Sequence, residues 1–280
     1  MLARAEAKGM LVTLDAGTVT VAAPAVSSAA VLTVTYGMDL IDFSADMDAR
    51  AQFQSVSSHG WDLASHTLQQ QTAAPETLNE QGNVTSATLA TVIGLSDFRL
   101  QSTVPLDAEE LTTWAKAQQI KSGLARIRGQ VSFQGSALAK PGTLIELVGV
   151  GERCNGNVFV SAVHHHVAEG NWITRAEFGM SPSWFTEATD ISAPPAAGLL
   201  PGISGLHVGV VMKLDEDPNK QYRVQVSIPE MSATTDGFWA RLTNFYSSNG
   251  VGAFFLPEIG DEVVLGFFND DPSHPVILGS

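Results

Sequence analysis

The sequence predicts a mainly β protein with a few helices, built as two domains joined by a linker. Three observations predict this class. Polar and apolar residues alternate for thirteen residues from Ile41 to Phe53, as in a long strand with one buried face. Short apolar runs separated by turn residues fill residues 205–280, as in a small all-β domain. Residues 186–204, between these regions, are rich in Pro and Gly and favour a linker.

Helices are expected at three places in the first part. Residues 2–9 have the composition of a helix end, with Gly9 at the position after the last turn. A short helix is expected over 86–93. The clearest helix begins after Asp107, a plausible N-cap with a Glu three positions later. Trp114 lies on the apolar stripe of this helix and is expected to anchor it in a core.

Strands and turns account for most of the remaining first part. Hairpin turns are expected at Asp15–Gly17 and at Glu169–Gly170, each flanked by alternating apolar residues. The polar stretch 69–85 contains Pro and Gly and is expected to be a surface excursion. Long strands such as the one predicted over 41–53 are typical of barrels.

The last part is expected to form a compact five-stranded barrel of the OB type. Five strand-like runs lie within residues 205–280, and turn residues at 215–220 and 269–274 divide them. A β-sandwich is the nearest alternative, but it requires about seven strands. Gly260 permits a turn before the fourth run, from which Val263, Leu265 and Phe267 are expected to alternate into the core. Asp271-Pro272 fixes the next reversal, after which Val276 and Leu278 are expected to pair back.

Composition and charge exclude several classes of protein. The formal net charge is −14, and acidic surfaces repel phosphate backbones, so nucleic-acid binding is disfavoured. No apolar run approaches the ~20 residues of a spanning helix, and the N-terminus does not have the pattern of a signal peptide. The charged fraction is only 16%, which suggests that partners cover part of the surface. Cys154 is alone, so an internal disulfide is excluded and a small residue in a turn is favoured over a nucleophile.

Residues that carry chemistry are few. His164 and His166 share one face of a predicted strand and are weak candidates for a metal site, but no third ligand is evident. Carboxylates occur as neighbours in three pairs that are expected to be solvated: Asp46/Asp48, Glu109/Glu110 and Asp261/Glu262. A Ser-His-Asp triad stays open from residue counts, although no G-x-S-x-G elbow is present. We therefore predict no catalytic residue and no cofactor.

Four aromatic residues of the last part have two interpretations. Trp239, Phe245, Phe254 and Phe255 could stack on sugars or on single-stranded bases, as in many OB folds. The acidic composition favours core or subunit contacts instead. Arg241, two residues after Trp239, is a candidate for the same subunit contact.

The tail resembles the OB-fold domain of the VgrG/Rhs-element Vgr spike family. The resemblance is carried by Tyr222–Val226, Phe238–Arg241, the stretch FLPEIGDEVVLGF at 255–267, Asp271-Pro272, Pro275-Val276 and Gly279-Ser280. The family usually has Gly-Asp-Pro in the last turn, where this chain has Asn269-Asp270-Asp271-Pro272. Asn and Asp tolerate left-handed turns, so the departure threatens little.

The first 185 residues resemble the hub part of the same family, which is similar to the phage baseplate hub. Four stretches carry this resemblance: 4–21, 32–62, 128–163 and 169–185. The resemblance implies a hub-type β-barrel domain over 1–185, equivalent to the second half of a full hub, a linker at 186–204 and an OB-fold domain over 205–280. Family members normally have another hub barrel before this region and a β-helical needle after it, so the sequence is expected to be a section of a longer spike protein.

The resemblance implies a non-enzymatic homotrimer that connects a hexameric tube, and the baseplate around it, to a membrane-puncturing needle or an effector extension. Such a component is assembled in the bacterial cytoplasm and is then secreted or carried on an extracellular particle. The residues expected at subunit contacts or in structural turns are Trp239, Arg241, Phe254, Phe255, Gly260, Asp261, Phe267, Asp271 and Pro272. Two alternatives stay open: an OB-fold module that binds sugar or single-stranded nucleic acid, and a hydrolase whose enzymatic domain follows the OB fold.

Overall fold

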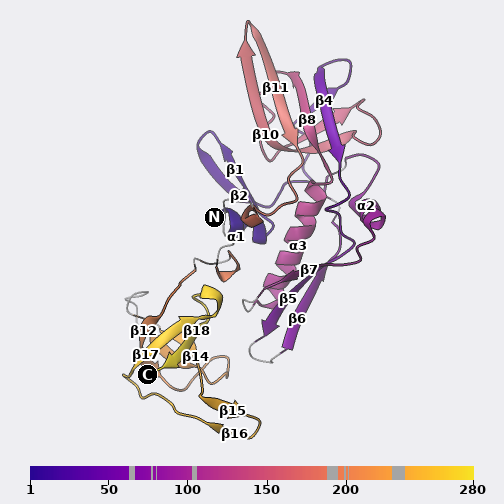
Figure 1. Ribbon diagram of the computed structural model, residues 1–280. Helices are drawn as coiled ribbons and strands as arrows, with labels where there is room; N and C mark the ends of the chain where they lie inside the picture. Colours follow the sequence, from indigo (N-terminus) through magenta and orange to yellow (C-terminus); the bar gives the residue numbers. More distant parts are fainter. Residues whose placement is uncertain are drawn as a thin grey trace. The chain divides into compact units, whose positions relative to one another are not determined.

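The structure is a computed structural model, and it describes residues 1–62, 67–76, 78–79, 81–102, 106–187, 195–198, 200, 202–228 and 237–280 (Figure 1). The chain divides into two compact units. Unit 1 comprises Met1–Gly60, Leu68–Ser102 and Leu106–Ser192, and unit 2 comprises Trp61–Thr67, Thr103–Pro105 and Ala193–Ser280. The predicted linker over 186–204 falls largely outside the described residues, so the linker and the domain limits around it stay predictions.

Three α-helices lie in unit 1: α1 (Leu2–Ala7), α2 (Ser86–Ile93) and α3 (Ala108–Leu124). Gly9 takes a left-handed φ of 68° just after α1, as predicted. Asp107 and Glu110 form a reciprocal capping box at the start of α3, which pairs backbone N–H groups that the helix leaves free. Trp114 is partly buried and packs on a cluster that contains Phe53, Val56 and Leu100, so its predicted anchoring role is confirmed.

The main sheet of unit 1 is a half-barrel of six strands. Their order is β3 (Leu32–Thr35), β9 (Leu144–Val148), β10 (Gly156–Ala168), β11 (Asn171–Phe178), β8 (Ile127–Gln134) and β4 (Leu40–Met47). The core beneath it includes Phe133, Ile145, Leu147 and Phe178, all nearly inaccessible to solvent. The predicted hairpin at Glu169–Gly170 is confirmed, and both residues have positive φ angles.

The strand predicted over 41–53 is shorter than expected and ends at Met47. A bulge at the start of β4 turns Ile41 outward instead of into the core. Beyond the strand, the Asp48 carboxylate accepts hydrogen bonds from the backbone N–H of Arg50 at 2.9 Å and from its guanidinium at 2.7 Å. These bonds close a turn and lower the pKa of Asp48 from 3.8 to about 2. Local side-chain bonding therefore outweighs the alternating pattern here.

Two smaller β elements complete unit 1. The hairpin of β1 (Leu11–Asp15) and β2 (Thr18–Ala22) turns at Ala16 and Gly17, as predicted. A three-stranded sheet has the order β6 (Thr67–Ala73), β5 (Val56–Asp62), β7 (Phe98–Gln101). The surface excursion predicted over 69–85 was wrong at its beginning, because β6 continues to Ala73.

Gly129 in the middle of β8 gives a direct test of how tightly the main sheet is packed. A Cβ at this position would lie 2.0 Å from the carbonyl oxygen of Ser44 and 2.8 Å from the ring of Phe178. Backbone atoms cannot move aside cheaply, so Gly129→Ala is expected to lower the free energy of unfolding by about 3 kcal/mol. The control is Gly60→Ala, whose Cβ would meet its neighbours at 3.4 Å or more. Equal chemical-denaturation midpoints for the two variants would contradict the observed packing.

Unit 2 contains a closed five-stranded barrel, as predicted. Its strands are β12 (His207–Lys213), β13 (Val224–Ser227), β14 (Phe238–Leu242), β18 (Pro275–Gly279) and β17 (Glu262–Phe267), in that order around the barrel. The hairpin β15 (Tyr246–Ser248) and β16 (Val251–Ala253) lies between β14 and β17 in sequence and forms a separate two-stranded sheet. Short 3-10 turns occur at Phe185–Glu187, Ala196–Gly198 and Phe268–Asp270.

The barrel core agrees with the predicted alternation along β17 but not along β18. Val263 and Leu265 are fully buried and Phe267 is partly buried against the same cluster. Ile277, which pairs with Leu265, fills the core, whereas Leu278 is 50% exposed. The expectation for Leu278 was wrong because a bulge between Val264 and Leu265 shifts the register by one residue. No helix in the described residues is both long and apolar enough to span a bilayer.

Candidate interaction surface

An exposed, aromatic stretch follows β14 on unit 2. We call residues Phe245–Ile259 the aromatic segment. Phe245 is 98% exposed and Phe255 is 80% exposed, and five other large apolar side chains of the segment are also exposed: Tyr246, Val251, Phe254, Leu256 and Ile259. Single exposed apolar residues are common, but a continuous group of them marks an interaction site.

The end of the aromatic segment is fixed to the barrel. The N–H of Gly260 donates to the carbonyl oxygen of Val211 at 2.9 Å, and the N–H of Val211 donates to that of Asp261 at 3.0 Å. The Asp261 carboxylate accepts from the N–H of Glu258 at 2.8 Å. Gly260 has a φ of 96°, which a residue with a Cβ rarely adopts. Gly260 and Asp261 thus hold the loop that presents the aromatic side chains.

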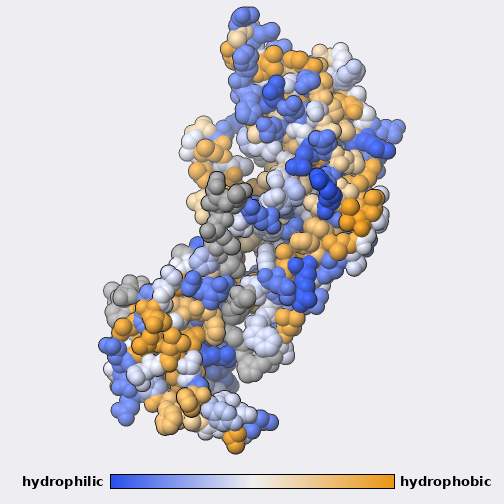
Figure 2. Space-filling model, in the orientation of Figure 1, coloured by the Kyte–Doolittle hydropathy of each residue, from blue (hydrophilic) through white to orange (hydrophobic). Residues whose placement is uncertain are grey.

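A second apolar surface covers part of the barrel wall. We call it the barrel outer face, and it consists of Leu206, Val208, Val264 and Leu278, all exposed. Val208 on β12 lies directly opposite Val264 on β17, and Leu278 lies beside Gly266. Figure 2 shows apolar side chains gathered where β12 and β17 run. None of these four residues is charged, so this part of the wall can lose water at little cost.

The other residues predicted for subunit contacts or turns lie around the barrel. Trp239 and Arg241 are half-buried on β14. The Phe267 ring meets the His207 ring edge-on, with centroids 5.6 Å apart. Asp271 is buried and accepts from the N–H of Ser273 at 2.8 Å, just beside Pro272. A role of these residues in contacts between copies stays a prediction.

The turn that departs from the family pattern is left-handed. Asn269 and Asp270 have φ angles of 49° and 57°. Both residue types tolerate this conformation without the Gly that the family usually carries.

The aromatic residues do not form a stacked platform. Within the described residues, no ring pair joins Trp239, Phe245, Phe254 and Phe255. Residues 205–280 contain ten acidic and four basic side chains, a net charge of −6. A platform for nucleic acid needs both stacked bases and cationic groups along the strand, and this surface offers neither.

The histidine run lies on an exposed part of β10. The His164 Nε2 is 3.4 Å from the Glu177 carboxylate, and His165 Nδ1 accepts from the Trp172 indole N–H at 3.3 Å. Among the described residues, no group of three or more His, Cys, Asp or Glu side chains could hold a metal ion. His164 and His166 therefore have no third protein ligand within one described chain.

The carboxylate pairs and the cysteine are held in structural roles. Asp48 is ion-paired with Arg50, Glu110 belongs to the capping box of α3, and Asp261 closes the turn after the aromatic segment. Burial raises the pKa of the Cys154 thiol, which opposes formation of the nucleophilic thiolate.

Ser57, His59 and Asp97 lie together but not in the order of a catalytic triad. The Ser57 hydroxyl donates to the Asp97 carboxylate and lies 3.1 Å from His59 Nε2. In a triad the histidine lies between the serine and the carboxylate, whereas here the serine lies between the other two. Ser57 is also completely buried. This cluster satisfies polar groups inside the β5–β7 sheet.

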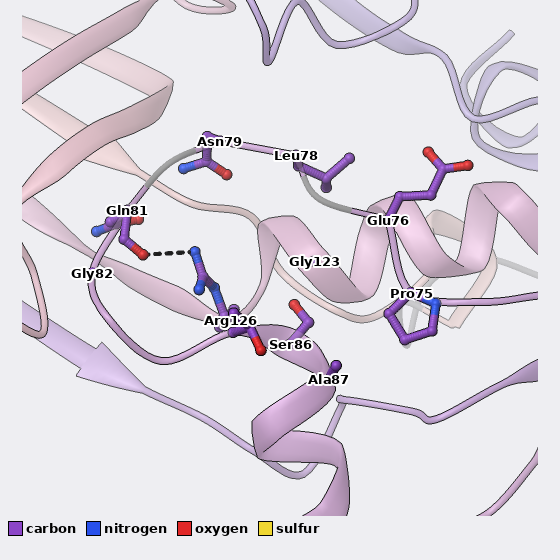
Figure 3. Close-up of a pocket in the computed structure, with 11 residues that line it drawn as sticks. Pro75, Glu76, Leu78, Asn79, Gln81, Gly82, Ser86, Ala87, Gly123 and Arg126 are labelled. Atoms are coloured by element: carbon purple, nitrogen blue, oxygen red, sulfur yellow. Dashed lines mark hydrogen bonds between the residues drawn. The ribbon is translucent and has the colours of Figure 1, made fainter.

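A cavity of about 410 Å³ opens beside the N-terminus of α2 (Figure 3). Arg126, largely buried, lines it, and its guanidinium donates to the carbonyl oxygens of Val84 and of Gln81, the latter at 2.9 Å. Desolvation lowers the pKa of Arg126. Both bonds staple the 81–84 loop, so the structure accounts for Arg126 without a ligand.

Family models match both parts of the chain. Residues 1–169 match the Alg8 N-terminal domain, and residues 207–280 match the type VI secretion system/phage-baseplate injector OB domain. The chain belongs to the VgrG-like spike family. Over more than half of its length it belongs to the Alg8 N-terminal domain family. The family predicted from the sequence is confirmed, and so is the predicted fold class.

Solved structures of tail proteins are similar to this VgrG-like chain at low identity. The tail protein from Neisseria meningitidis MC58 is 14% identical over 64% of this chain and 53% of that chain, with a TM-score of 0.44. The 43 kDa tail protein of prophage MuSo2 from Shewanella oneidensis is 11% identical over 62% and 50%, with a TM-score of 0.43.

The E. coli c3393 protein is described as a component of the type VI secretion system with structural similarity to the T4 tail proteins gp27 and gp5. It is 17% identical over 63% of this chain and 44% of that chain, with a TM-score of 0.36. The VgrG-like chain thus spans about half the length of these proteins. No curated protein matches it.

Proposed function

We propose that the chain is a structural spike-hub component of a contractile injection machine and catalyses no reaction. It acts as a homotrimer that connects a hexameric tube and the baseplate to a needle, tip or effector extension. Assembly takes place in the bacterial cytoplasm, and the component then leaves the cell by secretion or on an extracellular particle. The match to the injector OB domain and the likeness to tail proteins support this proposal.

The single observation that carries the proposal is the aromatic segment on the outside of a closed barrel. Seven large apolar side chains within fifteen residues are expensive to leave in water, at about 1.5–3 kcal/mol for each that a contact fully buries. Identical copies arranged around an axis can bury such a segment in each copy at once. A wall of this kind transmits force through packing and needs no reacting group.

Light scattering after size exclusion tests the proposal on the full chain. The expected mass is three times that of one chain of 29.6 kDa. A stable monomer at micromolar concentration would contradict the proposal.

The alternative function, binding of sugar or single-stranded nucleic acid, is favoured by the exposed Phe254 and Phe255. We expect no binding of a labelled oligonucleotide at micromolar chain concentration, because residues 205–280 carry a net charge of −6. Fluorescence anisotropy over a salt series measures this. Micromolar affinity that weakens as salt rises would favour the alternative.

A further inference from the structure

The β1–β2 hairpin turns its apolar face away from the rest of unit 1. Val12 lies opposite Val21 and Leu14 lies opposite Val19, so these four side chains share one face. Leu14 is 64% exposed and Val19 is 54% exposed, and Val21 is exposed as well. A hairpin on a protein surface normally has the reverse arrangement, with its apolar face inward.

The other face of the hairpin holds it to unit 1. Leu11 packs against the cluster of Leu124, Leu144 and Phe159, and Asp15 forms an ion pair with Lys140 at 2.9 Å. Because this face is the one attached, the hairpin cannot rotate its valines inward without losing these contacts. A two-stranded hairpin alone is marginally stable in water, so a surface that covers the outward face would stabilise it.

A second uncharged face lies on α2. The twelve residues from Thr85 to Ser96 contain no charged side chain, and Val92, Ile93 and Leu95 are exposed. The Thr91 hydroxyl donates to the carbonyl oxygen of Thr88 at 2.6 Å, and the Thr85 and Thr88 hydroxyls bond to each other at 2.9 Å. Since these hydroxyls already have partners within the helix, the face can be dehydrated without leaving them unpaired. A solvated surface helix normally carries charges on this side.

The two faces lie on different sides of unit 1. In Figure 1 the hairpin and α2 are on either side of α3. Two different patches on opposite sides of one unit form a heterologous contact, which closes into a ring when the rotation between copies permits. The occupant that the charges favour is a second copy. A chain with a net charge of −14 repels itself over most surfaces, and both of these faces are free of charge.

We propose that the outward face of the β1–β2 hairpin of one copy packs on α2 of the next copy, in a head-to-tail contact around the ring. The number of copies, three, rests on the proposed function. The contact itself rests on the inverted hairpin and on the uncharged helix. Val19 and Val92 mark its two sides.

Cysteine cross-linking of the full chain tests this contact. In a Cys154→Ser background, which removes the native thiol, Val19→Cys and Val92→Cys are combined in one chain and treated with a short bis-maleimide. Both positions are exposed, so the fold is expected to tolerate them. We expect covalent trimers from the double variant. Mixed copies that each carry one of the two cysteines should give covalent dimers, and each single variant alone should give none. A control pairs Val19→Cys with Val167→Cys, exposed on β10, and should give no covalent ring.

Each result separates the contact from the proposed function. A trimer by light scattering that gives no cross-link overturns the contact and leaves the proposed function standing. Cross-linking of Val19→Cys copies with one another shows a symmetric hairpin contact and also overturns the proposal. A monomeric chain overturns both.

Discussion

Phe254→Ser combined with Phe255→Ser is expected to convert trimers into single chains. Both rings are exposed on the aromatic segment, so removing them leaves the barrel core intact. If a contact buries both rings at about 2 kcal/mol each, the double variant weakens it by about 4 kcal/mol, roughly a thousandfold in affinity. Light scattering at micromolar concentration measures the change in mass.

The matched control removes an equally exposed aromatic ring elsewhere on unit 2. Tyr222 is 90% exposed and has a φ of 57°, a conformation that Asn tolerates. Tyr222→Asn should therefore leave the mass unchanged. If the Phe variant stays trimeric, or if both variants dissociate equally, the aromatic segment is not the specific contact.

Asp217→Ala is expected to lower the stability of the barrel by about 3 kcal/mol. The Asp217 carboxylate is almost inaccessible, bonds the Arg223 guanidinium at 2.7 Å and accepts from the N–H groups of Asn219 and Gln221 at 3.1 and 2.8 Å. Its removal leaves the arginine and these amides of the β12–β13 loop without their acceptor. Hydrogen exchange of β12 and β13 measures the local free energy of opening. Asp215→Ala, which removes the same charge from an exposed position of the same loop, should change it by less than about 0.5 kcal/mol.

The same carboxylate predicts a pH dependence. The bond to Arg223 holds the pKa of Asp217 far below its ordinary value of 3.8. A depressed folded-state pKa stabilises the fold fully above the unfolded value, and this contribution is lost as the pH falls below about 4 toward the folded value. The stability difference between wild type and Asp217→Ala should therefore shrink on acidification below pH 4. An unchanged difference would show that the charge of Asp217 is not what stabilises the loop.

The elements with strong local signals were predictable from the sequence. The capping box at Asp107, the hairpin turns at Ala16–Gly17 and Glu169–Gly170, and the five barrel strands all have turn or cap residues that leave one conformation favoured. Local propensity and tertiary packing agree in these regions.

The wrong predictions have tertiary or side-chain causes. Bulges near Ile41 and before Leu265 reverse the side-chain pattern by one residue, and an alternating sequence does not reveal where a bulge falls. Asp48 closed a turn where the apolar pattern continued, because its carboxylate found Arg50.

The outward-facing features were only partly predictable. Phe254 and Phe255 were expected at a contact, and the structure exposes them. The inverted hairpin was missed, although a signal existed in the pairing of two Val-rich strands. Alternation shows that a hairpin has an apolar face, but only the packing of Leu11 and Asp15 shows which way that face points.

Electron cryomicroscopy of the full chain tests the central claim most directly, namely that identical copies clasp one another through these uncharged β surfaces. We predict a particle with threefold symmetry in which the side chains of the aromatic segment are buried between copies. A solitary chain with Phe245, Phe254 and Phe255 open to solvent would contradict the account.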